Sequence, residues 1–256
     1  MPPTLAPRPR QLHIFYRHVH SSANARSRDP NKARPAWFSL QRCFANLLST
    51  LAADPQRARV QLTVMYDSPA ELLADDALYP RLQNSPVPLK LQLVDGRSDL
   101  NSFRITVAHA YNTVQQPDDL VYLLENDYLH APGWLSKVFE VFDSGHAFQY
   151  VSLYDHKDKY FLAMYQDLQA RLYLSANHHW RTAPSTCGSF IFARSTLEAD
   201  RDALLSGQPD FHLFGMLVGQ RRRTLLTPIP GLSTHAMEGY TSPHVDWDAI
   251  AAQSGT

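Results

Sequence analysis

Short apolar segments that end in a carboxylate recur along this chain and alternate with amphipathic stretches. Five segments read as strands: LHIFYR (12–17), VQLTVMYD (60–67), PLKLQLVD (88–95), DLVYLLEND (119–127) and FQYVSLYD (148–155). Between them, residues 37–54, 101–114 and 133–145 carry apolar side chains at helical spacing. This β-α-β alternation predicts an α/β fold with a mostly parallel central sheet flanked by helices.

Four of the expected strands end in an aspartate, and the first three of these residues would reach the same edge of the sheet. In open α/β sheets, ligands bind outside the carboxyl ends of the strands. Asp67, Asp95 and Asp127 would therefore line one crevice. The sequence predicts the ligand site at this edge.

The 256 residues are enough to bury one full core, and no linker, repeat or low-complexity tract divides them. We expect a disordered lead-in over 1–10, a single domain over 11–248 and a tail over 249–256. No apolar run approaches the roughly 20 residues that span a bilayer, and MPPTLAPRPRQ lacks the apolar core of a secretory signal. Cys43 and Cys187 are too few for a disulfide scaffold, so we expect a reducing, cytoplasmic location and no membrane partner.

The formal net charge of zero conceals an uneven distribution of charge along the chain. Residues 1–42 contain eight Lys or Arg and one Asp, a net charge of +7, so the remainder carries −7. A basic block of this kind suits phosphates, either in a nucleotide or in nucleic acid. A solvated loop is the alternative.

The triplet Glu125-Asn126-Asp127 directly follows an apolar run. Carboxylate oxygens favour Mg²⁺ or Mn²⁺, and such ions often keep open positions for substrate phosphates. His235 follows the strand-like segment TLLTPIP and is a further candidate ligand, because imidazole binds manganese. Capping of the next helix by the carboxylates and a surface position for His235 are the alternatives.

Two further stretches hold candidate substrate-binding residues. HHWRTAPST (178–186) places His179, Trp180 and Arg181 ahead of an apolar strand. This order suits a loop that holds a polar ligand under an aromatic ring, or else simple packing of the tryptophan. Asp210 precedes an amphipathic stretch and would be a helix cap or a general base. Arg221–Arg223, at the end of that stretch, would complement the helix dipole or contact phosphates.

Several well-known signatures are absent from the sequence. No GxGxxG follows the first strand, and no Walker loop, GxSxG or HExxH occurs. A dinucleotide fold of the usual type is therefore unsupported. A metal-dependent phosphohydrolase would need more acidic and histidine ligands, enough for two ions.

The order of these candidate residues resembles that of a GT-A-fold glycosyltransferase of the nucleotide-diphosphosugar type. The set runs through Asp67, Asp95, Arg104, the triplet 125–127, Asp210 and His235, and the resemblance covers roughly residues 11–247. In that family a DXD motif ends the fourth strand and holds Mn²⁺ or Mg²⁺ against the donor diphosphate. LLENDY has Glu in the first position, so the resemblance implies a metal site of Asp127, which makes the direct bond, with Glu125 and with His235 as third ligand.

The resemblance also implies roles for residues outside the metal site. Asp210 would be the catalytic base of an inverting enzyme, although Pro209 stands where the family usually has Glu. A retaining reaction assisted by the leaving phosphate is the alternative. A UDP-sugar is the expected donor, since Asp67 would accept the ring N–H of a uracil-type base. The donor-binding residues would be Tyr16, Arg17, Asp67, Asp95, Arg104 and Asn126.

Within this fold, the stretches HWRTAPST, PIPGLSTH and VDW resemble small stand-alone enzymes of phages and bacteria. Some phage members glycosylate hydroxymethylated pyrimidines in DNA. One expected acceptor is therefore a 5-hydroxymethylpyrimidine in DNA, held by His179, Trp180 and Arg181. A hydroxyl of a surface glycan or small molecule is the alternative acceptor. The alternative of another class is a non-catalytic module that binds nucleic acid or a sugar nucleotide.

Overall fold

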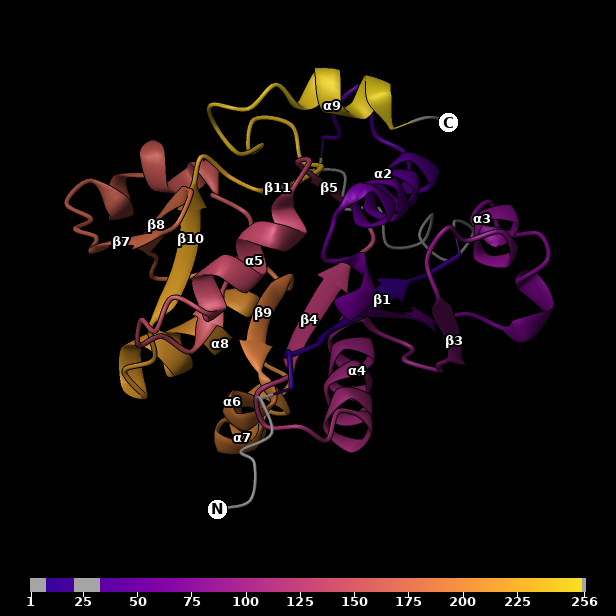
Figure 1. Cartoon of the computed structure of the whole chain (residues 1–256), viewed down its shortest axis with the longest axis horizontal. Coiled ribbons are helices and arrows are strands. Elements are labelled where there is room, and N and C mark those ends of the chain that lie inside the picture. The colour runs from indigo at the N-terminus through magenta and orange to yellow at the C-terminus, as the bar shows by residue number, and fades with distance from the viewer. Residues whose placement is uncertain (1–7, 21–32, 255–256) are drawn as a thin grey trace, which may run out of the picture.

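The computed structural model describes residues 8–20 and 33–254, which form a single α/β domain. In this part of the chain, nine strands make one mixed sheet (Figure 1). In spatial order they are β3 (Leu89–Leu93), β2 (Val60–Tyr66), β1 (Leu12–His18), β4 (Leu120–Glu125), β9 (Phe190–Ala193), β6 (Tyr150–Val151), β10 (Leu225–Ile229), β8 (His178–Thr182) and β7 (Leu172–Ser175). A separate ribbon pairs β5 (Tyr128–His130) with β11 (Ser233–His235).

The first half of the sheet is parallel, as the β-α-β alternation predicts. β1 pairs in parallel with both β2 and β4, and β2 pairs in parallel with β3. The connections between them include α2 (Leu40–Ala53) and α4 (Asp99–Thr113). The predicted α/β fold is confirmed.

The second half of the sheet is largely antiparallel. β9 runs antiparallel to β4 and β6, and β8 runs antiparallel to β10 and β7, while β10 and β6 are parallel. The chain enters β9 beside the end of β4, where Phe190 lies opposite Leu123, so β9 has to run back along it. The sheet as a whole is therefore mixed rather than mostly parallel.

Helices cover both faces of the sheet, and β4 shows how the sequence specifies this. Leu120, Tyr122 and Leu124 belong to a core cluster with residues of α2 and of α5 (Trp134–Phe142). Val121 and Leu123 belong to a second cluster with residues of α4, α6 (Arg194–Ala199) and α8 (Asp210–Phe214). Successive side chains of a strand point to opposite faces, so a continuous apolar run is buried on both sides.

The remaining helical segments are short: η1 (Arg57–Arg59), η2 (Ala70–Leu72), α3 (Tyr79–Gln83), η3 (Lys157–Tyr160), η4 (Ala163–Tyr165), α7 (Arg201–Leu204) and the π-helical η5 (Gly215–Gln220). α4 begins two residues before the predicted helix 101–114. The Ser98 side chain accepts a hydrogen bond from the Asn101 N–H and so caps the helix. None of the helices in the described ranges is long and apolar enough to cross a membrane.

Both ends of the described chain are tied into the domain. Arg8 Nη2 lies 2.6 Å from Asp119 Oδ1. The last helix, α9 (Trp247–Gln253), lies beside α2 (Figure 1) and shares a small core cluster with Cys43. Residues 8–10 and 249–253 thus contact the rest of the described chain, whereas residues 1–7 and 255–256 lie outside the described ranges. The boundaries of the lead-in, the domain and the tail stay predictions.

Candidate functional site

Three parallel strands end side by side and place charged residues at one edge of the sheet. Arg17 of β1 lies opposite Glu125 of β4, and the N–H of Asp67, after β2, donates to the carbonyl of His18 (2.8 Å). Arg17 Nη2 is 3.1 Å from Glu125 Oε1, while its Nη1 is 3.0 Å from Asp99 Oδ1. A buried guanidinium shared by two carboxylates therefore lies at this edge.

Asp127 and His235 form an ion pair although 108 positions separate them in the sequence. The pairing of β5 with β11 sets His235 opposite Tyr128, and the imidazole stacks on the Tyr128 ring at 5.0 Å. His235 Nε2 lies 2.9 Å from Asp127 Oδ2. Burial opposes charge on both groups, but His235 and Arg34 hold the pKa of Asp127 below its usual range, and Asp127 raises the pKa of His235. Each of the two groups therefore favours the charged form of the other.

This pair fits two ligands of a divalent cation. Adjacent ligands on an octahedral ion with bonds of about 2.1 Å lie about 3 Å apart, close to the 2.9 Å between Oδ2 and Nε2. Asp127 Oδ1 is buried and has no hydrogen-bond partner among the described residues. Within residues 8–20 and 33–254, no group of three or more His, Cys, Asp or Glu could hold a metal ion. Further ligands would have to come from elsewhere, such as a bound diphosphate.

Glu125 has contacts of its own, directed away from the ion pair. Its Oε2 accepts a hydrogen bond from Ser189 Oγ (3.3 Å), which in turn accepts one from the Glu125 N–H (3.0 Å). Gly188 makes room for this carboxylate, because a Cβ there would lie 3.0 Å from Oε1. Burial raises the pKa of Glu125 to about 8 despite the opposing charge of Arg17. Its hydrogen bonds run to Arg17 and Ser189 rather than to Asp127 or His235.

Asp210 belongs to the same neighbourhood. It is the first residue of α8, and Pro209 occupies the cap position, so Asp210 is not the cap of this helix. Its charge acts on both Glu125 and Arg17 and raises the pKa of each. The structure therefore brings Asp210 to the edge that carries Arg17 and Glu125.

Three further residues expected to bind the donor, Asp67, Asp95 and Arg104, have different contacts. Asp67 Oδ1 accepts a hydrogen bond from the Gly96 N–H (2.6 Å), which holds this carboxylate at the end of β2. Asp95 is exposed and pairs with Arg97. Arg104 donates to the carbonyl of Leu205 (3.0 Å). Asp67 thus lies at the strand ends, whereas Arg104 is bound to the turn after α7.

Two aromatic residues expected at the site lie in the core. Tyr16 is 2% exposed, its ring packs against Phe44 at 5.0 Å, and its hydroxyl donates to the carbonyl of Asn126. Trp180 has no exposed surface, and its Nε1–H donates to Ser175 Oγ. Burial of Trp180 favours the packing alternative, and neither ring offers a face to a ligand.

The other polar residues named from the sequence are distributed over different contacts. The Asn126 amide donates to His18 Nδ1 (3.2 Å). Arg181 Nη2 lies 2.6 Å from Asp155 Oδ1, and both side chains are buried. His179 is exposed and lines an open cavity of about 410 Å³ at the β7–β8 hairpin. The structure does not bring His179, Trp180 and Arg181 together on one surface.

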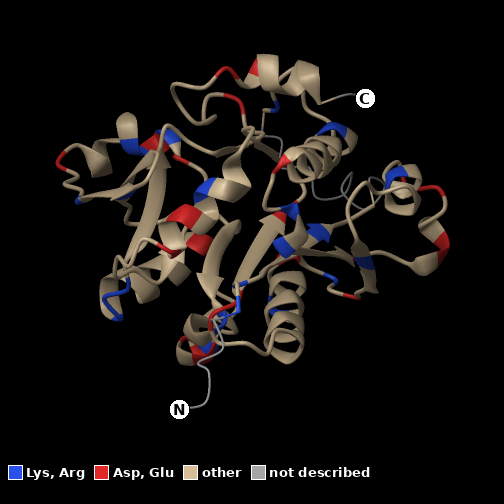
Figure 2. Ribbon diagram, viewed as in Figure 1, with Lys and Arg blue, Asp and Glu red and all other residues tan. Residues whose placement is uncertain are grey.

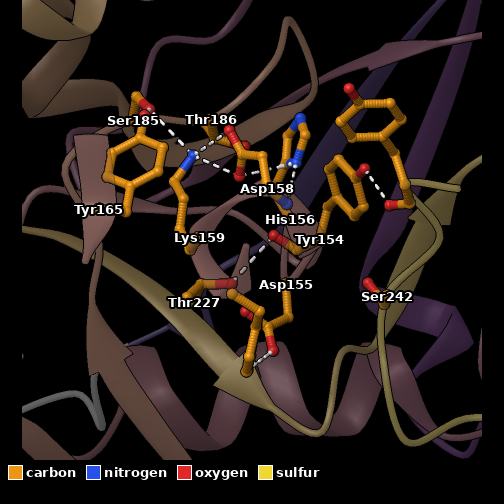
Figure 3. Close-up of polar contacts among 12 residues, drawn as sticks. Tyr154, Asp155, His156, Asp158, Lys159, Tyr165, Ser185, Thr186, Thr227 and Ser242 are labelled. Atoms are coloured by element: carbon orange, nitrogen blue, oxygen red, sulfur yellow. Dashed lines mark hydrogen bonds and ion pairs between the residues drawn. The ribbon is translucent and has the colours of Figure 1, made fainter. Parts of the chain in front are cut away.

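The loop after β6 holds a polar cluster that the sequence analysis left unassigned (Figure 3). His156 Nδ1 lies 2.8 Å from Asp158 Oδ1. Lys159 Nζ lies 3.0 Å from the same oxygen and donates to Ser185 Oγ (3.1 Å). Seven consecutive titratable residues, YDHKDKY (154–160), are the sequence signal for this cluster.

Cys187 connects this cluster to the ion pair. Its thiol is close enough to His156 and His235 for both histidines to act on its pKa. Burial by itself would raise the pKa of Cys187, yet the two histidines lower it to about 7. The candidate site therefore extends from Arg17 and Glu125, through Asp127 and His235, to His156.

Comparison with known proteins gives similarity in structure and none in sequence. No family model and no curated protein matches the chain. The structure is similar to GalNAc-T7 with UDP, GalNAc and Mn²⁺, with a TM-score of 0.52 and 13% identity over 90% of this chain and 44% of that chain. It also matches mouse xyloside xylosyltransferase 1 (TM-score 0.43, 10% identity, 83% and 77% of the two chains). A third match is the inositol-1-phosphate CTP transferase of T. maritima (TM-score 0.48, 10% identity, 95% and 96%).

The likeness to GalNAc-T7 shows the fold, since the identity is low and the chain spans less than half of that protein. The domain has a GT-A-like α/β fold with a mixed central sheet, as in the matched part of that protein.

Proposed function

We propose that this protein is a metal-dependent glycosyltransferase, which moves a sugar from a nucleotide-diphosphosugar to an acceptor hydroxyl. The single observation that carries the proposal is the buried Asp127–His235 pair, which follows β4 in a GT-A-like fold. The presence of UDP and Mn²⁺ in the GalNAc-T7 structure supports a UDP-sugar as donor and Mn²⁺ or Mg²⁺ as cofactor.

The donor phosphates would lie at the strand ends. Asp127 and His235 would hold the divalent cation, which supplies neutralisation of the charge on the leaving nucleoside diphosphate. Arg17 adds a fixed positive charge, and Glu125 orients it through the 3.1 Å contact. Asp67 Oδ1 is engaged by the Gly96 N–H, so Oδ2 is the oxygen that would accept a ring N–H of the base.

Asp210 is the proposed general base of an inverting reaction. It is close to Glu125 and Arg17 and is not used as a helix cap. Its carboxylate would accept the proton of the acceptor hydroxyl as that oxygen attacks the anomeric carbon, opposite the leaving diphosphate. Proton removal by a positioned carboxylate typically accelerates such a step by roughly 10²–10⁴-fold.

The acceptor would bind on the His156 side of the site. Here the ring of His156 lies 5.8 Å from that of Tyr240, and Phe161, which is 54% exposed, has its ring 5.6 Å from that of Tyr240. Aromatic rings of this kind stack on sugar or base rings. We therefore propose a hydroxyl acceptor that carries a ring.

The described residues give little support to DNA as the acceptor. Arg221 and Arg223 are paired with Asp200 instead of facing solvent as phosphate ligands. Basic and acidic residues are interspersed over the described ribbon (Figure 2). The basic positions 26, 28 and 32 lie outside the described ranges. A glycan or small-molecule hydroxyl is equally compatible with the aromatic group around His156.

The test is a screen of nucleotide sugars in Mn²⁺ with glycan, small-molecule and hydroxymethylated-DNA acceptors, read by mass spectrometry. Release of a nucleoside diphosphate together with a glycosylated product is the expected result. Release of pyrophosphate when a nucleoside triphosphate and a sugar phosphate are supplied would instead establish nucleotidyl transfer. If neither occurs, the non-catalytic binding module becomes the better interpretation.

Two variants and a control test whether the activity depends on the candidate site. Asp127→Asn should lower kcat/KM by roughly a hundredfold or more, because Lewis-acid stabilisation is worth several kcal/mol. Asp210→Asn should lower kcat while donor binding is kept. Asp202→Asn, at an exposed carboxylate, is the matched control and should behave as wild type. Full activity of a folded Asp127→Asn protein would refute the assignment.

A further inference from the structure

Arg34 reaches the Asp127 carboxylate from a segment that the function proposed above does not use. Its Nη2 lies 2.8 Å from Asp127 Oδ2, and its Nη1 donates to the carbonyl of Ala236 (2.6 Å). The guanidinium also lies 4.5 Å from the centre of the Phe38 ring. Three contacts therefore hold this positive charge in one place.

The backbone beside Arg34 is fixed to the loop that follows His235. The carbonyl of Ala33 accepts a hydrogen bond from the Glu238 N–H (2.9 Å), and the Ala236 N–H donates to the Asp127 carbonyl (2.8 Å). Arg34, His235 and Asp127 are thus placed by the same backbone contacts. The guanidinium is part of the site, although 30% of its side chain is exposed.

One oxygen of Asp127 receives both cationic side chains. Oδ2 faces His235 Nε2 at 2.9 Å and Arg34 Nη2 at 2.8 Å, while Oδ1 is buried with no partner among the described residues. A divalent cation bound to this carboxylate would be close to the guanidinium, and like charges at such a distance repel. The Arg34 guanidinium at Asp127 therefore weakens cation binding, and a bound cation weakens the contact between Arg34 and Asp127.

We propose that the Arg34 guanidinium competes with a divalent metal ion for Asp127. Once the metal ion is bound, the guanidinium pairs with the donor diphosphate. The diphosphate part rests on the proposed function. Guanidinium binds carboxylate and phosphate oxygens with the same planar pair of N–H groups, so a diphosphate can replace Asp127 as its partner. The flexible side chain allows this exchange while the backbone stays fixed by its contacts to the loop after His235.

The first measurement is Mn²⁺ binding without nucleotide, by the paramagnetic resonance signal of free Mn²⁺. Arg34→Ala should bind Mn²⁺ about tenfold more tightly than wild type, because a charge-assisted hydrogen bond no longer occupies Asp127. Arg34→Lys keeps the charge without the planar fork and should fall between the two. Arg57→Ala, at an exposed arginine of η1, is the matched control and should be unchanged. Circular dichroism verifies that each variant is folded.

The second measurement is calorimetric binding of inorganic pyrophosphate to protein saturated with Mn²⁺. Here Arg34→Ala should bind about tenfold more weakly than wild type, opposite in sign to its effect on Mn²⁺. Equal Mn²⁺ affinity of Arg34→Ala and wild type, or no Mn²⁺ binding by either, overturns the competition with the metal ion. Equal pyrophosphate affinity, or none, overturns the pairing with diphosphate. Failure of the donor screen with both opposite effects present would refute the transferase and leave the role of Arg34 standing.

Discussion

At the scale of single residues, Gly96 shows how close packing positions a polar group at the site. Its N–H donates to Asp67 Oδ1, and a Cβ at this position would lie 2.2 Å from Asp67 Oδ2 and 2.9 Å from the Ser102 Cα. Neither the carboxylate nor the backbone of α4 can stay in place against such an atom. Glycine is therefore required here by close approach.

Gly96→Ala should displace the Asp67 carboxylate and weaken binding of UDP in Mn²⁺ by about tenfold, the cost of one lost hydrogen bond to a charged group. Overpacking should also lower the free energy of unfolding by about 1–3 kcal/mol. Gly219→Ala is the control, because no atom lies within 4 Å of its added Cβ. Calorimetric titration compares the two, and equal affinities would remove Asp67 from the donor site.

At the scale of elements, Asp200 joins segments that are far apart in the sequence. Its carboxylate, fully buried between α6 and α7, accepts hydrogen bonds from the Tyr150 hydroxyl (2.8 Å), from Arg223 Nη2 (2.8 Å) and from Arg221 Nη1 (3.1 Å). Through this carboxylate, Arg221 and Arg223 fasten the segment before β10 to the α6–α7 turn, and Tyr150 fastens the start of β6 to the same turn.

Asp200→Asn should lower the free energy of unfolding by about 2–4 kcal/mol at pH 7, because two partly buried arginines lose their counter-charge. Burial opposes ionisation, but the bonds from Arg223, Tyr150 and Arg221 lower the pKa of Asp200. A lowered pKa stabilises the fold above the unfolded-state value of about 3.9, and this contribution is lost as the pH falls through the folded-state pKa.

Urea unfolding of both proteins over this pH range is the measurement. The difference between wild type and Asp200→Asn should shrink as the pH falls. Asp202→Asn, with 75% of its side chain exposed, should change stability little at any pH. A constant difference down to the lowest pH would show that the ionic pairs contribute nothing.

At the scale of the whole molecule, the site lies where the two halves of the chain meet. The parallel half supplies Arg17, Asp67, Glu125 and Asp127, and the later part of the chain supplies Asp210 and His235. Tyr154 and Ser233 form a further β-bridge beside the ribbon of β5 and β11. A ligand at the candidate site would therefore contact both halves of a domain whose two large core clusters share one sheet.

Saturation with UDP and Mn²⁺ should raise the melting temperature of the whole domain in a single transition. Ligand at 100 times its Kd stabilises the folded state by about 2.7 kcal/mol, equivalent to roughly 5–10 °C for a chain of this size. Asp127→Asn should show a smaller shift under the same conditions. Differential scanning calorimetry is the measurement, and two transitions, one of them insensitive to ligand, would contradict a single cooperative unit.

The sequence by itself determined the strands and the long helices of the parallel half of the sheet, whereas residues 178–182, expected in a loop, form β8. Apolar periodicity reports which faces of a strand or helix are buried, and strand ends follow from where the apolar runs stop. The order of acidic residues and His235 pointed to the GT-A fold through resemblance. The sequence did not predict the direction of β9. That direction depends on where the β7–β8 hairpin before it ends.

Only the tertiary structure decided what each polar side chain contacts. Trp180 is buried, Arg181 forms an ion pair with Asp155, and Arg221 and Arg223 form ion pairs with Asp200. Arg34, one of the eight basic residues in positions 1–42, forms an ion pair with Asp127. Periodicity depends on neighbours within a few positions, whereas the partner of a charge depends on the folding of residues tens of positions away.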